Sequence, residues 1–456
     1  MTSFNTVNPY NGKPLSSYAY MDKEAAEREV KRAARAFEDW RTLDIKNRAM
    51  PLKTCARLLK DRAGEYAVLM AQEMGKPVGQ GLAEAEKCAW VCDYFADNAA
   101  AFLNDHPVDT GASKSYIAIE PLGPVLAIMP WNFPFWQFFR FAAPALMAGN
   151  TVVLKHAPGT TGCGVAIKQL IRDAGFPDGA LSLVIVTNTI AAEIIRHPAI
   201  RGVTLTGSTR AGRSVAAIAG QALKKTVLEL GGSDPYIVLA DADVAQAADR
   251  CVKSRLINSG QSCIAAKRWI VEQAIADEFE SAVLDGMNAA ITGDPMDEKT
   301  TVGPLARKDL RTKLHAQVTA SIRAGAKVLA GGRLPRRSGF FYPPTVLTRV
   351  KKGMPAFDEE LFGPAAAIVR ASNEKHAIQL ANDSHYGLGA AIFTADIKRA
   401  ERIAREDIRA GCVFINDFVK SDPRLPFGGI KDSGYGRELG HHGILEFVNV
   451  KTISIA

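Results

Sequence analysis

Residues 123–155 read GPVLAIMPWNFPFWQFFRFAAPALMAGNTVVLK, and their pattern indicates the fold class. Its two ends, 123–129 and 151–155, are short apolar runs with β-branched residues, and a helical stretch lies between them at 134–148. A strand, a helix and a second strand in this order are typical of a βαβ unit with parallel strands. The alternation continues with strand-like runs at 181–186 and 202–206 and helical runs at 160–174 and 190–197. The sequence therefore predicts an α/β fold on a mostly parallel sheet.

A second α/β series begins after Gly231-Gly232. The strand YIVLA (236–240), a helix at 243–259 and the strand KRWIVE (267–272) open it, and the series continues to residue 425. The first hundred residues have the apolar spacing of helices, including one helical run at about 48–74. We expect two Rossmann-like α/β domains, a dinucleotide-binding domain formed by residues 1–114 and 124–230 and a catalytic domain formed by residues 231–425.

Two further segments, SYIAIEPLG (115–123) and VNVKTISIA (448–456), alternate like half-exposed strands and have no local partner. They are expected to pair with each other or with a neighbouring subunit. We therefore assign residues 115–123 and 426–456 to an oligomerisation and bridging segment that includes a small β arm, and we expect a homodimer or a tetramer.

The composition is that of an ordinary globular protein, with 47% hydrophobic and 23% charged residues. The formal charge of +8 fits an anionic ligand such as a dinucleotide, although basic residues scattered over solvated faces would give the same value. No block of Lys and Arg with interleaved aromatic residues occurs, so nucleic acid is not an expected partner.

Neither a membrane segment nor a secretion signal is expected. The N-terminal residues are polar and turn-rich, without the basic and apolar regions of a signal peptide. The most apolar stretch, 138–154, is interrupted by Arg140 and Asn150. Seven cysteines at irregular spacing do not predict a disulfide framework, so we expect a reducing, cytoplasmic location.

Cys263 differs from the other cysteines in its setting, Gly260-Gln261-Ser262-Cys263. It follows a helical segment on a loop of small polar residues, where a thiol can be exposed and its thiolate solvated by backbone N–H groups. The remaining cysteines lie in apolar or helical surroundings that are typical of core positions. From its setting alone, Cys263 is either a nucleophile or one more small core residue.

Two polar side chains interrupt apolar strand-like sequence. Glu229 lies in TVLELGG (226–232), where desolvation would raise its pKa and suit it to act as a general base; alternatively it faces solvent at the strand end. Asn132 lies in PWNFP (130–134), after a strand, where its amide could donate to an oxyanion or form an Asx turn.

No Gly-x-Gly-x-x-Gly motif or P-loop marks a phosphate site. The best candidate is GSTRAG (207–212), directly after the strand at 202–206. A helix beginning near Ser208 would offer free N–H groups to a pyrophosphate, although Gly and Ser are common in any turn between a strand and a helix.

Seven blocks together closely resemble the aldehyde dehydrogenase superfamily over nearly the whole chain. They occur in the family's order, with Glu229 preceding Cys263 at the family's interval. The blocks are PWNFP (130–134), VLKHAP (153–158), TLTGSTRAG (204–212), LELGGSDP (228–235), GQSC (260–263), EELFGP (359–364) and LPFGGIKDSGYGRE (425–438).

The resemblance implies a reaction through a thioester. Cys263 is then the nucleophile, its oxyanion is held by the Asn132 amide and the Cys263 backbone N–H, and Glu229 activates the water that hydrolyses the thioester. The same resemblance implies NADP or NAD as cofactor and no metal. The cofactor contacts that it implies are Trp131, Lys155, Pro158, Gly207, Ser208, Leu230, Glu360 and Phe362.

Pro158 is a departure that bears on the choice of cofactor. Many members that prefer NAD have Glu at this place, three residues after the ribose-binding lysine, where it accepts from the 2′-hydroxyl. Because Pro158 has no carboxylate to repel a 2′-phosphate, we expect the protein to tolerate or prefer NADP. A second departure is residues 186–190, which lack the family's usual Gly-rich turn.

The substrate is suggested by Arg140, which lies on an otherwise apolar, aromatic helix and needs an anionic partner, either a substrate carboxylate or a structural ion pair. Succinate-semialdehyde dehydrogenases have Arg at the matching position, and the chain resembles their shorter bacterial branch. The resemblance implies that Trp136, Arg140 and Ser421 bind the distal carboxylate of succinate semialdehyde. Glutarate semialdehyde would be poorly excluded, because one methylene gives only about 1–3 kcal/mol of discrimination.

Three alternatives stay open at the level of sequence. A broad-range or glutarate-semialdehyde dehydrogenase would use the same chemistry. A CoA-acylating relative would pass the acyl group to a thiol, but such relatives commonly lack the glutamate found here at position 229. A non-enzymatic binding or structural protein would have no use for Cys263, Glu229 and Asn132 together.

Overall fold

In the computed structural model, which describes residues 2–456, the stretch 123–155 folds as predicted into β5 (Val125–Ile128), α5 (Trp136–Met147) and β6 (Val152–Lys155). These two parallel strands lie inside a six-stranded sheet of order β17-β9-β8-β5-β6-β7. All neighbours in this sheet run parallel except β17, which is antiparallel to β9. The remaining strands are β7 (Leu181–Leu183), β8 (Gly202–Thr206), β9 (Lys225–Glu229) and β17 (Gly434–Tyr435).

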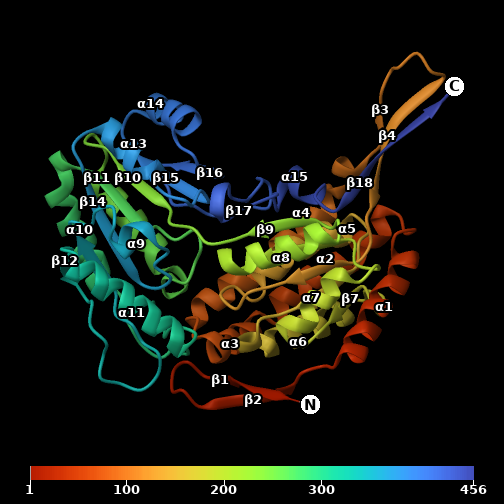
Figure 1. Ribbon diagram of the computed structural model, residues 1–456, viewed down its shortest axis with the longest axis horizontal. Helices are drawn as coiled ribbons and strands as arrows, with labels where there is room; N and C mark the ends of the chain where they lie inside the picture. Colours follow the sequence, from red (N-terminus) through yellow and green to blue (C-terminus); the bar gives the residue numbers. More distant parts are fainter. Residues whose placement is uncertain (1) are drawn as a thin grey trace.

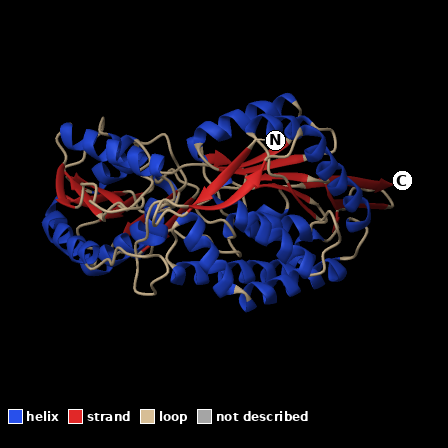
Figure 2. Cartoon of the chain, turned by 90° about the horizontal axis from the view of Figure 1, so that it is seen from below, coloured by secondary structure: helices blue, strands red, loops and turns tan. Residues whose placement is uncertain are grey.

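Helices cover both faces of this sheet because its strands are apolar on both sides (Figure 2). Leu126 and Val153 pack toward one layer, formed by α1 (Lys23–Trp40), α7 (Asn188–Arg196) and α8 (Thr209–Gln221). Ala127 and Leu154 face the other layer. That layer contains α5 together with α2 (Ile45–Asp61), α3 (Ala63–Met74), α4 (Val78–Leu103) and α6 (Thr161–Asp173).

The second α/β series forms a seven-stranded sheet of order β12-β13-β14-β11-β10-β15-β16, parallel except at the β12–β13 pair. Figure 1 shows it as a separate lobe beside the first sheet. Its strands are β10 (Pro235–Val238), β11 (Arg268–Glu272), β12 (Lys327–Ala330), β13 (Thr345–Thr348), β14 (Ala365–Ala371), β15 (Gly389–Phe393) and β16 (Cys412–Ile415). Its helices are α9 (Val244–Leu256), α10 (Ala276–Asn288), α11 (Lys308–Arg323), α12 (Pro355–Asp358), α13 (Glu374–Asn382) and α14 (Ile397–Arg402).

The two segments without a local partner pair with each other, as one of the predicted alternatives. Strand β4 (Lys114–Pro121) lies antiparallel to β18 (Val448–Ile455), and β3 (His106–Pro107) adds to its other edge. This three-stranded arm projects from the body, and the C-terminus lies near its tip (Figure 1). Within the predicted oligomerisation and bridging segment 426–456, β17 joins the six-stranded sheet, α15 (Gly440–Ile444) contacts α5, and β18 forms the arm.

Two N-terminal features differ from the sequence prediction. The helical run expected at 48–74 consists of two helices, because the backbone at Arg62 (φ −107°, ψ 16°) interrupts it. Residues near the N-terminus form an unpredicted hairpin of β1 (Ser3–Val7) and β2 (Pro14–Ala19). Among residues 2–456, no helix is both long enough and apolar enough to cross a bilayer.

The strand order places a ligand site at one edge of the six-stranded sheet. The chain runs outward from β5 through β6 to β7 and then returns to the other side of β5 as β8 and β9. Ligands bind outside the carboxyl ends of strands where such an order reverses. The polar residues singled out from the sequence lie at the carboxyl ends of β5, β6, β8 and β9.

Candidate active site

Two cavities meet at Cys263. The first, here called the sheet-edge cavity, has a volume of about 390 Å³ and lies at the carboxyl ends of β5, β6 and β8. The second, the helix-side cavity, has a volume of about 280 Å³ and lies between α4, α5 and residues 418–421. Among the residues that the structure describes, Cys263 alone lines both. A nucleophile at this position would face one ligand from each side.

The predicted cofactor residues line one cavity, and the predicted substrate residues line the other. The sheet-edge cavity is lined by Asn132 and by the complete set of predicted cofactor contacts, Trp131, Lys155, Pro158, Gly207, Ser208, Leu230, Glu360 and Phe362. The helix-side cavity is lined by the three predicted substrate residues, Trp136, Arg140 and Ser421. Glu229 lines neither cavity and is buried at the end of β9.

Lys155 and the start of α8 are suited to an anionic ligand in the sheet-edge cavity. Burial lowers the pKa of Lys155, and no charged neighbour opposes this shift. A cation so placed gains from an anionic or hydroxyl-rich ligand. Ser208 begins α8 by accepting from the N–H of Ala211 at 3.3 Å, so the first N–H groups of this helix point out of its end beside Gly207. The features fit a dinucleotide's phosphates and ribose.

The opposite wall of the sheet-edge cavity comes from the second sheet's lobe. Glu360 accepts from the backbone N–H of Gly232 at 3.0 Å and lies 3.7 Å from the Lys267 ammonium. Phe362 packs edge-to-face on Trp131, with 5.7 Å between ring centroids. Sequence reasoning missed Arg307, Leu310, Lys313, Leu314 and Gln317, which line the same wall from α11 and the residue before it.

The loop that carries Cys263 is tightly held rather than freely exposed. The side chain of Asn258 donates to the carbonyl oxygens of Asn132, at 2.6 Å, and Gln261, at 3.1 Å. Asn258 and Ser259 both adopt φ of 54°, a left-handed conformation that these contacts keep in place. Lys267 donates to the carbonyl oxygen of Cys263 at 2.6 Å. Such contacts fix the direction in which the thiol points.

Asn132 is buried, and its amide donates to the carbonyl oxygen of Gln261 at 3.0 Å. An amide nitrogen carries two hydrogens, so this bond leaves one for another acceptor. Because the bond joins the Asn132 turn to the loop of Cys263, it fixes the amide relative to the sulfur.

The structure corrects the expectation of an exposed, readily ionised thiol. Cys263 is half-buried, and burial raises the pKa of its thiol to about 12, although the positive charges of Arg140 and Lys267 act in the opposite direction. The thiol is therefore protonated near neutral pH, and a base must take its proton for it to act as a nucleophile.

Glu229 is the residue that the sequence predicts as the general base. Its side chain is 1% exposed, and neither carboxylate oxygen has a hydrogen-bond partner among the described residues. Burial holds its pKa well above the usual value, a shift that Arg140 opposes and Glu438 reinforces. The solvent-facing alternative was wrong, and the predicted desolvation is confirmed.

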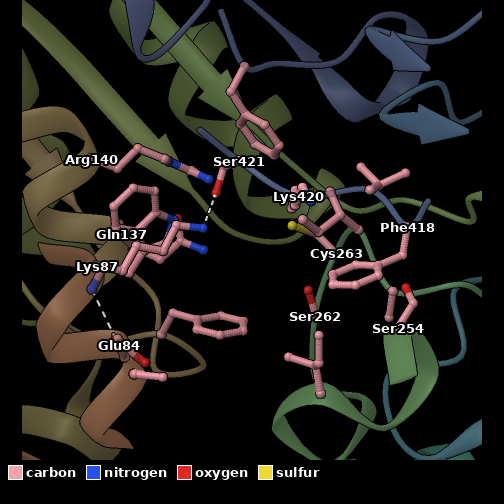
Figure 3. A pocket seen from close by; sticks show the side chains of 18 of the residues that line it. Glu84, Lys87, Gln137, Arg140, Ser254, Ser262, Cys263, Phe418, Lys420 and Ser421 are labelled. Atoms are coloured by element: carbon pink, nitrogen blue, oxygen red, sulfur yellow. Dashed lines mark hydrogen bonds between the residues drawn. The ribbon is translucent and has the colours of Figure 1, made fainter. Parts of the chain in front are cut away.

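Arg140 lines the helix-side cavity and also has the structural partner that the sequence left open. It forms a buried ion pair with Glu438, and its Nη2 donates to the Thr206 hydroxyl at 3.3 Å. The guanidinium also stacks over the ring of Phe427, 4.8 Å from the centroid. Figure 3 shows the end of the side chain pointing toward Ser421. Glu438 lies in the GYGRE block, but its contact with Arg140 could not be read from the sequence.

Lys87 and Glu84 are site residues that the sequence analysis missed. Lys87 reaches the helix-side cavity from α4 and donates to the Ser421 hydroxyl at 2.9 Å. Glu84, one turn earlier, forms a buried ion pair with Lys76 and accepts from the backbone N–H groups of Phe135 and Trp136, each at 3.0 Å. Glu84 thus fixes the start of α5. Both are charged residues on the apolar face of a helix, a signal available in the sequence but not recognised there.

Cys263, the predicted nucleophile, lies between a cavity suited to a dinucleotide and a second cavity lined by cationic side chains, and the comparisons with known proteins assign the chain to a class. It belongs to the aldehyde dehydrogenase family, whose model matches residues 1–453. Among individual relatives, it is 47% identical over 451 residues to a probable succinate-semialdehyde dehydrogenase [NADP(+)] of Synechocystis sp., covering 99% of each chain. It is 45% identical over 448 residues to the succinate semialdehyde dehydrogenase [NAD(P)+] Sad of Escherichia coli, covering 98% of this chain and 97% of that one.

The solved structures agree with this assignment. A succinic semialdehyde dehydrogenase from Streptococcus pyogenes, in complex with NADP+, superposes with a TM-score of 0.97 at 37% identity and 99% coverage of both chains. The protein Gox0499, studied for its selection of cofactor and substrate, superposes with a TM-score of 0.98 at 42% identity over the full length of both chains. The predicted α/β fold of this family is confirmed.

Proposed function

We propose that the protein oxidises succinate semialdehyde to succinate with NADP or NAD. The observation that carries this proposal is the position of Cys263, between the sheet-edge cavity and the cationic helix-side cavity. Its similarity to succinate-semialdehyde dehydrogenases over nearly its whole length also supports the substrate.

The first step is attack by the Cys263 sulfur on the aldehyde carbon. The new C–S bond converts the carbonyl oxygen into an oxyanion, which accepts from the remaining N–H of the Asn132 amide and from the Cys263 backbone N–H. Because the thiol has a raised pKa, its proton must leave as the sulfur attacks, and solvent water takes it.

A bound nicotinamide would supply the hydride acceptor for the tetrahedral carbon, and Cys263 would then hold the acyl group as a thioester. Glu229 then takes a proton from water, the hydroxyl oxygen bonds to the acyl carbon, and the C–S bond breaks to release the carboxylate. Since Glu229 lines neither cavity in the present conformation, its side chain must rotate toward Cys263 to reach that water.

The cofactor would occupy the sheet-edge cavity. Lys155 would contact its adenosine ribose, Gly207 and Ser208 its pyrophosphate, and Glu360 with Phe362 its nicotinamide ribose, while Trp131 and Leu230 pack against it. Pro158 begins the short turn after β6 and lines the cavity without a carboxylate. A 2′-phosphate therefore meets no repulsion from that position, which supports NADP.

The substrate would occupy the helix-side cavity with its aldehyde at Cys263 and its carboxylate at the far end. Trp136, Arg140 and Ser421 form that end. Lys87 donates to Ser421 at this end, and Figure 3 shows the Arg140 guanidinium pointing toward it. Hydrogen-bond donors therefore gather where an anionic group would bind.

We further infer a homodimer or tetramer assembled through the arm, in the reducing cytoplasm. Strand β18 lies at the edge of its three-stranded sheet, and its Val450 and Ile455 are 61% and 49% exposed. An exposed edge with apolar side chains is a site where another strand adds. All seven cysteines are free, which suits a reducing compartment. Gel filtration showing a monomer would contradict the assembly.

The substrate proposal is tested by initial rates with succinate semialdehyde and with butanal, which has the same carbon chain without the carboxylate. We expect kcat/KM to be about 10- to 100-fold higher for the semialdehyde, because its carboxylate would form charge-assisted hydrogen bonds that butanal lacks. One succinate should form for each cofactor molecule that is reduced. Equal kcat/KM values would leave a broad-range aldehyde dehydrogenase. Higher kcat/KM for glutarate semialdehyde would shift the assignment to the longer substrate.

A further inference from the structure

Lys87 brings a second cation into the helix-side cavity from a different helix of the same layer. It lies on α4, whereas Trp136 and Arg140 lie on α5 and Ser421 lies on the loop after β16. Its ammonium group donates to the Ser421 hydroxyl at 2.9 Å and lies 4.3 Å from the centroid of the Trp136 ring. Figure 3 shows Lys87 and Arg140 converging on Ser421, with the Cys263 sulfur across the cavity.

The two cations differ in how their charge is balanced. Arg140 is paired with the buried carboxylate of Glu438, so much of its charge is compensated before any ligand enters. Among residues 2–456, no carboxylate lies within ion-pair distance of Lys87, whose ammonium is held by a neutral hydroxyl and an aromatic face. A half-buried cation without an anionic partner gains more from an anionic ligand than one that is already paired.

The charged groups around Lys87 come from every element packed against it. Glu84 and Cys88 lie on its own helix, Arg140 faces it from α5, and Asp422 faces it from the loop that carries Ser421. Burial, followed by the charge of Arg140, lowers the pKa of Lys87 to about 8, while Cys88, Glu84 and Asp422 act in the opposite direction. Lys87 is therefore charged below about pH 8 and loses that charge as the pH rises.

We propose that Lys87 is the residue that selects anionic aldehydes, by binding the distal carboxylate of the substrate together with the Ser421 hydroxyl. Ser421 accepts from Lys87, which leaves its own hydrogen free to donate to a carboxylate oxygen. Arg140, fixed by Glu438 and Phe427, completes the far wall of the cavity. The proposal rests on the proposed function in one respect, that the substrate carries a carboxylate.

The preference for an anionic aldehyde should depend on pH. Protonated Lys87 attracts the carboxylate, and neutral Lys87 does not. The kcat/KM for succinate semialdehyde should therefore fall as the pH rises through about 8, whereas kcat/KM for butanal should show no fall from this group. A general effect of pH on the chemistry would change both substrates alike.

The test compares Lys87→Met and Lys87→Arg with the unaltered protein, using succinate semialdehyde and butanal across this pH range. In Lys87→Met we expect the ratio of the two kcat/KM values to fall about 10- to 100-fold, through KM, and its decline at high pH to disappear. Lys87→Arg should retain the preference and extend it to higher pH, because an arginine stays protonated there. Lys60→Met is the matched control, since Lys60 contacts α4 on its outer side through Asp93 at 2.9 Å.

A binding measurement makes the test independent of turnover. Succinate should inhibit butanal oxidation by the unaltered protein, and its inhibition constant should rise about 10- to 100-fold in Lys87→Met. If Lys87→Met keeps the full preference and the same inhibition by succinate, the role of Lys87 is wrong while the proposed function stands. If the unaltered protein shows neither preference for the semialdehyde nor inhibition by succinate, the proposed function itself fails.

Discussion

The guanidinium of Arg140 and the carboxylate of Glu438 form a buried ion pair beside Glu229. The two partners affect the pKa of Glu229 in opposite directions, since Arg140 lowers it and Glu438 raises it. Arg140 thus links the wall of the helix-side cavity to the proposed base. The pKa of Glu229 therefore depends on how far the negative charge of Glu438 offsets the positive charge of Arg140.

Glu438→Gln should therefore make Glu229 easier to ionise. The substitution removes a negative charge from its surroundings and leaves the positive charge of Arg140 uncompensated, and both changes lower the pKa of Glu229. Because the base is active when ionised, the acidic limb of the kcat profile should move to lower pH. The profile would be measured with butanal from about pH 6 to about pH 9. Movement to higher pH would contradict this account of the cluster.

Glu84→Ala should destabilise the fold and disturb the start of α5. Removing one partner of a buried ion pair costs about 3–5 kcal/mol, and here two backbone N–H groups also lose their acceptor. We expect a lower Tm by calorimetry and a higher KM for the semialdehyde. The matched control is Glu86→Ala on the exposed side of the same helix, which should leave Tm nearly unchanged. Equal Tm values for the two variants would show that Glu84 contributes little.

Pro158→Glu should change the choice of cofactor. A carboxylate beside the ribose site would accept from a 2′-hydroxyl and repel a 2′-phosphate, so the affinity for NADP should fall about 10- to 100-fold while that for NAD is retained or rises. Calorimetric titration with each dinucleotide measures both values. Pro158→Gln controls for the loss of the proline ring without the added charge. Similar losses for NAD and NADP in Pro158→Glu would place the 2′-phosphate elsewhere.

The raised pKa of Cys263 predicts slow alkylation near neutral pH. Since the thiolate is the reactive form, labelling by iodoacetamide should accelerate about tenfold per pH unit between neutrality and pH 9. Peptide mass spectrometry would locate the label, and Cys263→Ala should lack it. Fast labelling at pH 7 that does not change with pH would mean that the thiol is already ionised in the unliganded protein.

The sequence was most informative for residues whose place in the fold follows from the order of neighbouring strands and helices. Residues at or just beyond the last position of a parallel strand lie at its carboxyl end, so the strand pattern predicted that Asn132, Lys155 and Ser208 lie at one edge of the sheet. The buried strands were recognisable because they are apolar on both faces. The hairpin of β1 and β2 was missed for the opposite reason, since most of its residues are exposed and give no apolar alternation.

The remaining features depend on contacts between distant parts of the chain. Arg140 pairs with Glu438, which lies 298 positions away in the sequence. The sequence alone could therefore not decide whether Arg140 has a partner inside the protein. Lys87 meets Ser421 across 334 positions. The raised pKa of Cys263 reflects its half-buried loop, which tertiary packing determines. Side-chain type and spacing predicted which residues gather, but not how their charges are balanced.

Trapping the acyl group in Glu229→Gln tests directly whether the reaction passes through a thioester on Cys263. This variant keeps the nucleophile but lacks the base that activates water, so kcat should fall by about 10²- to 10⁴-fold and the thioester should persist. After reaction with succinate semialdehyde and NADP and an acid quench, mass spectrometry should find one succinyl group on the peptide that contains Cys263, and none in the double variant with Cys263→Ala. Rapid turnover by Glu229→Gln, or a succinyl group at another residue, would contradict the proposed roles of Glu229 and Cys263.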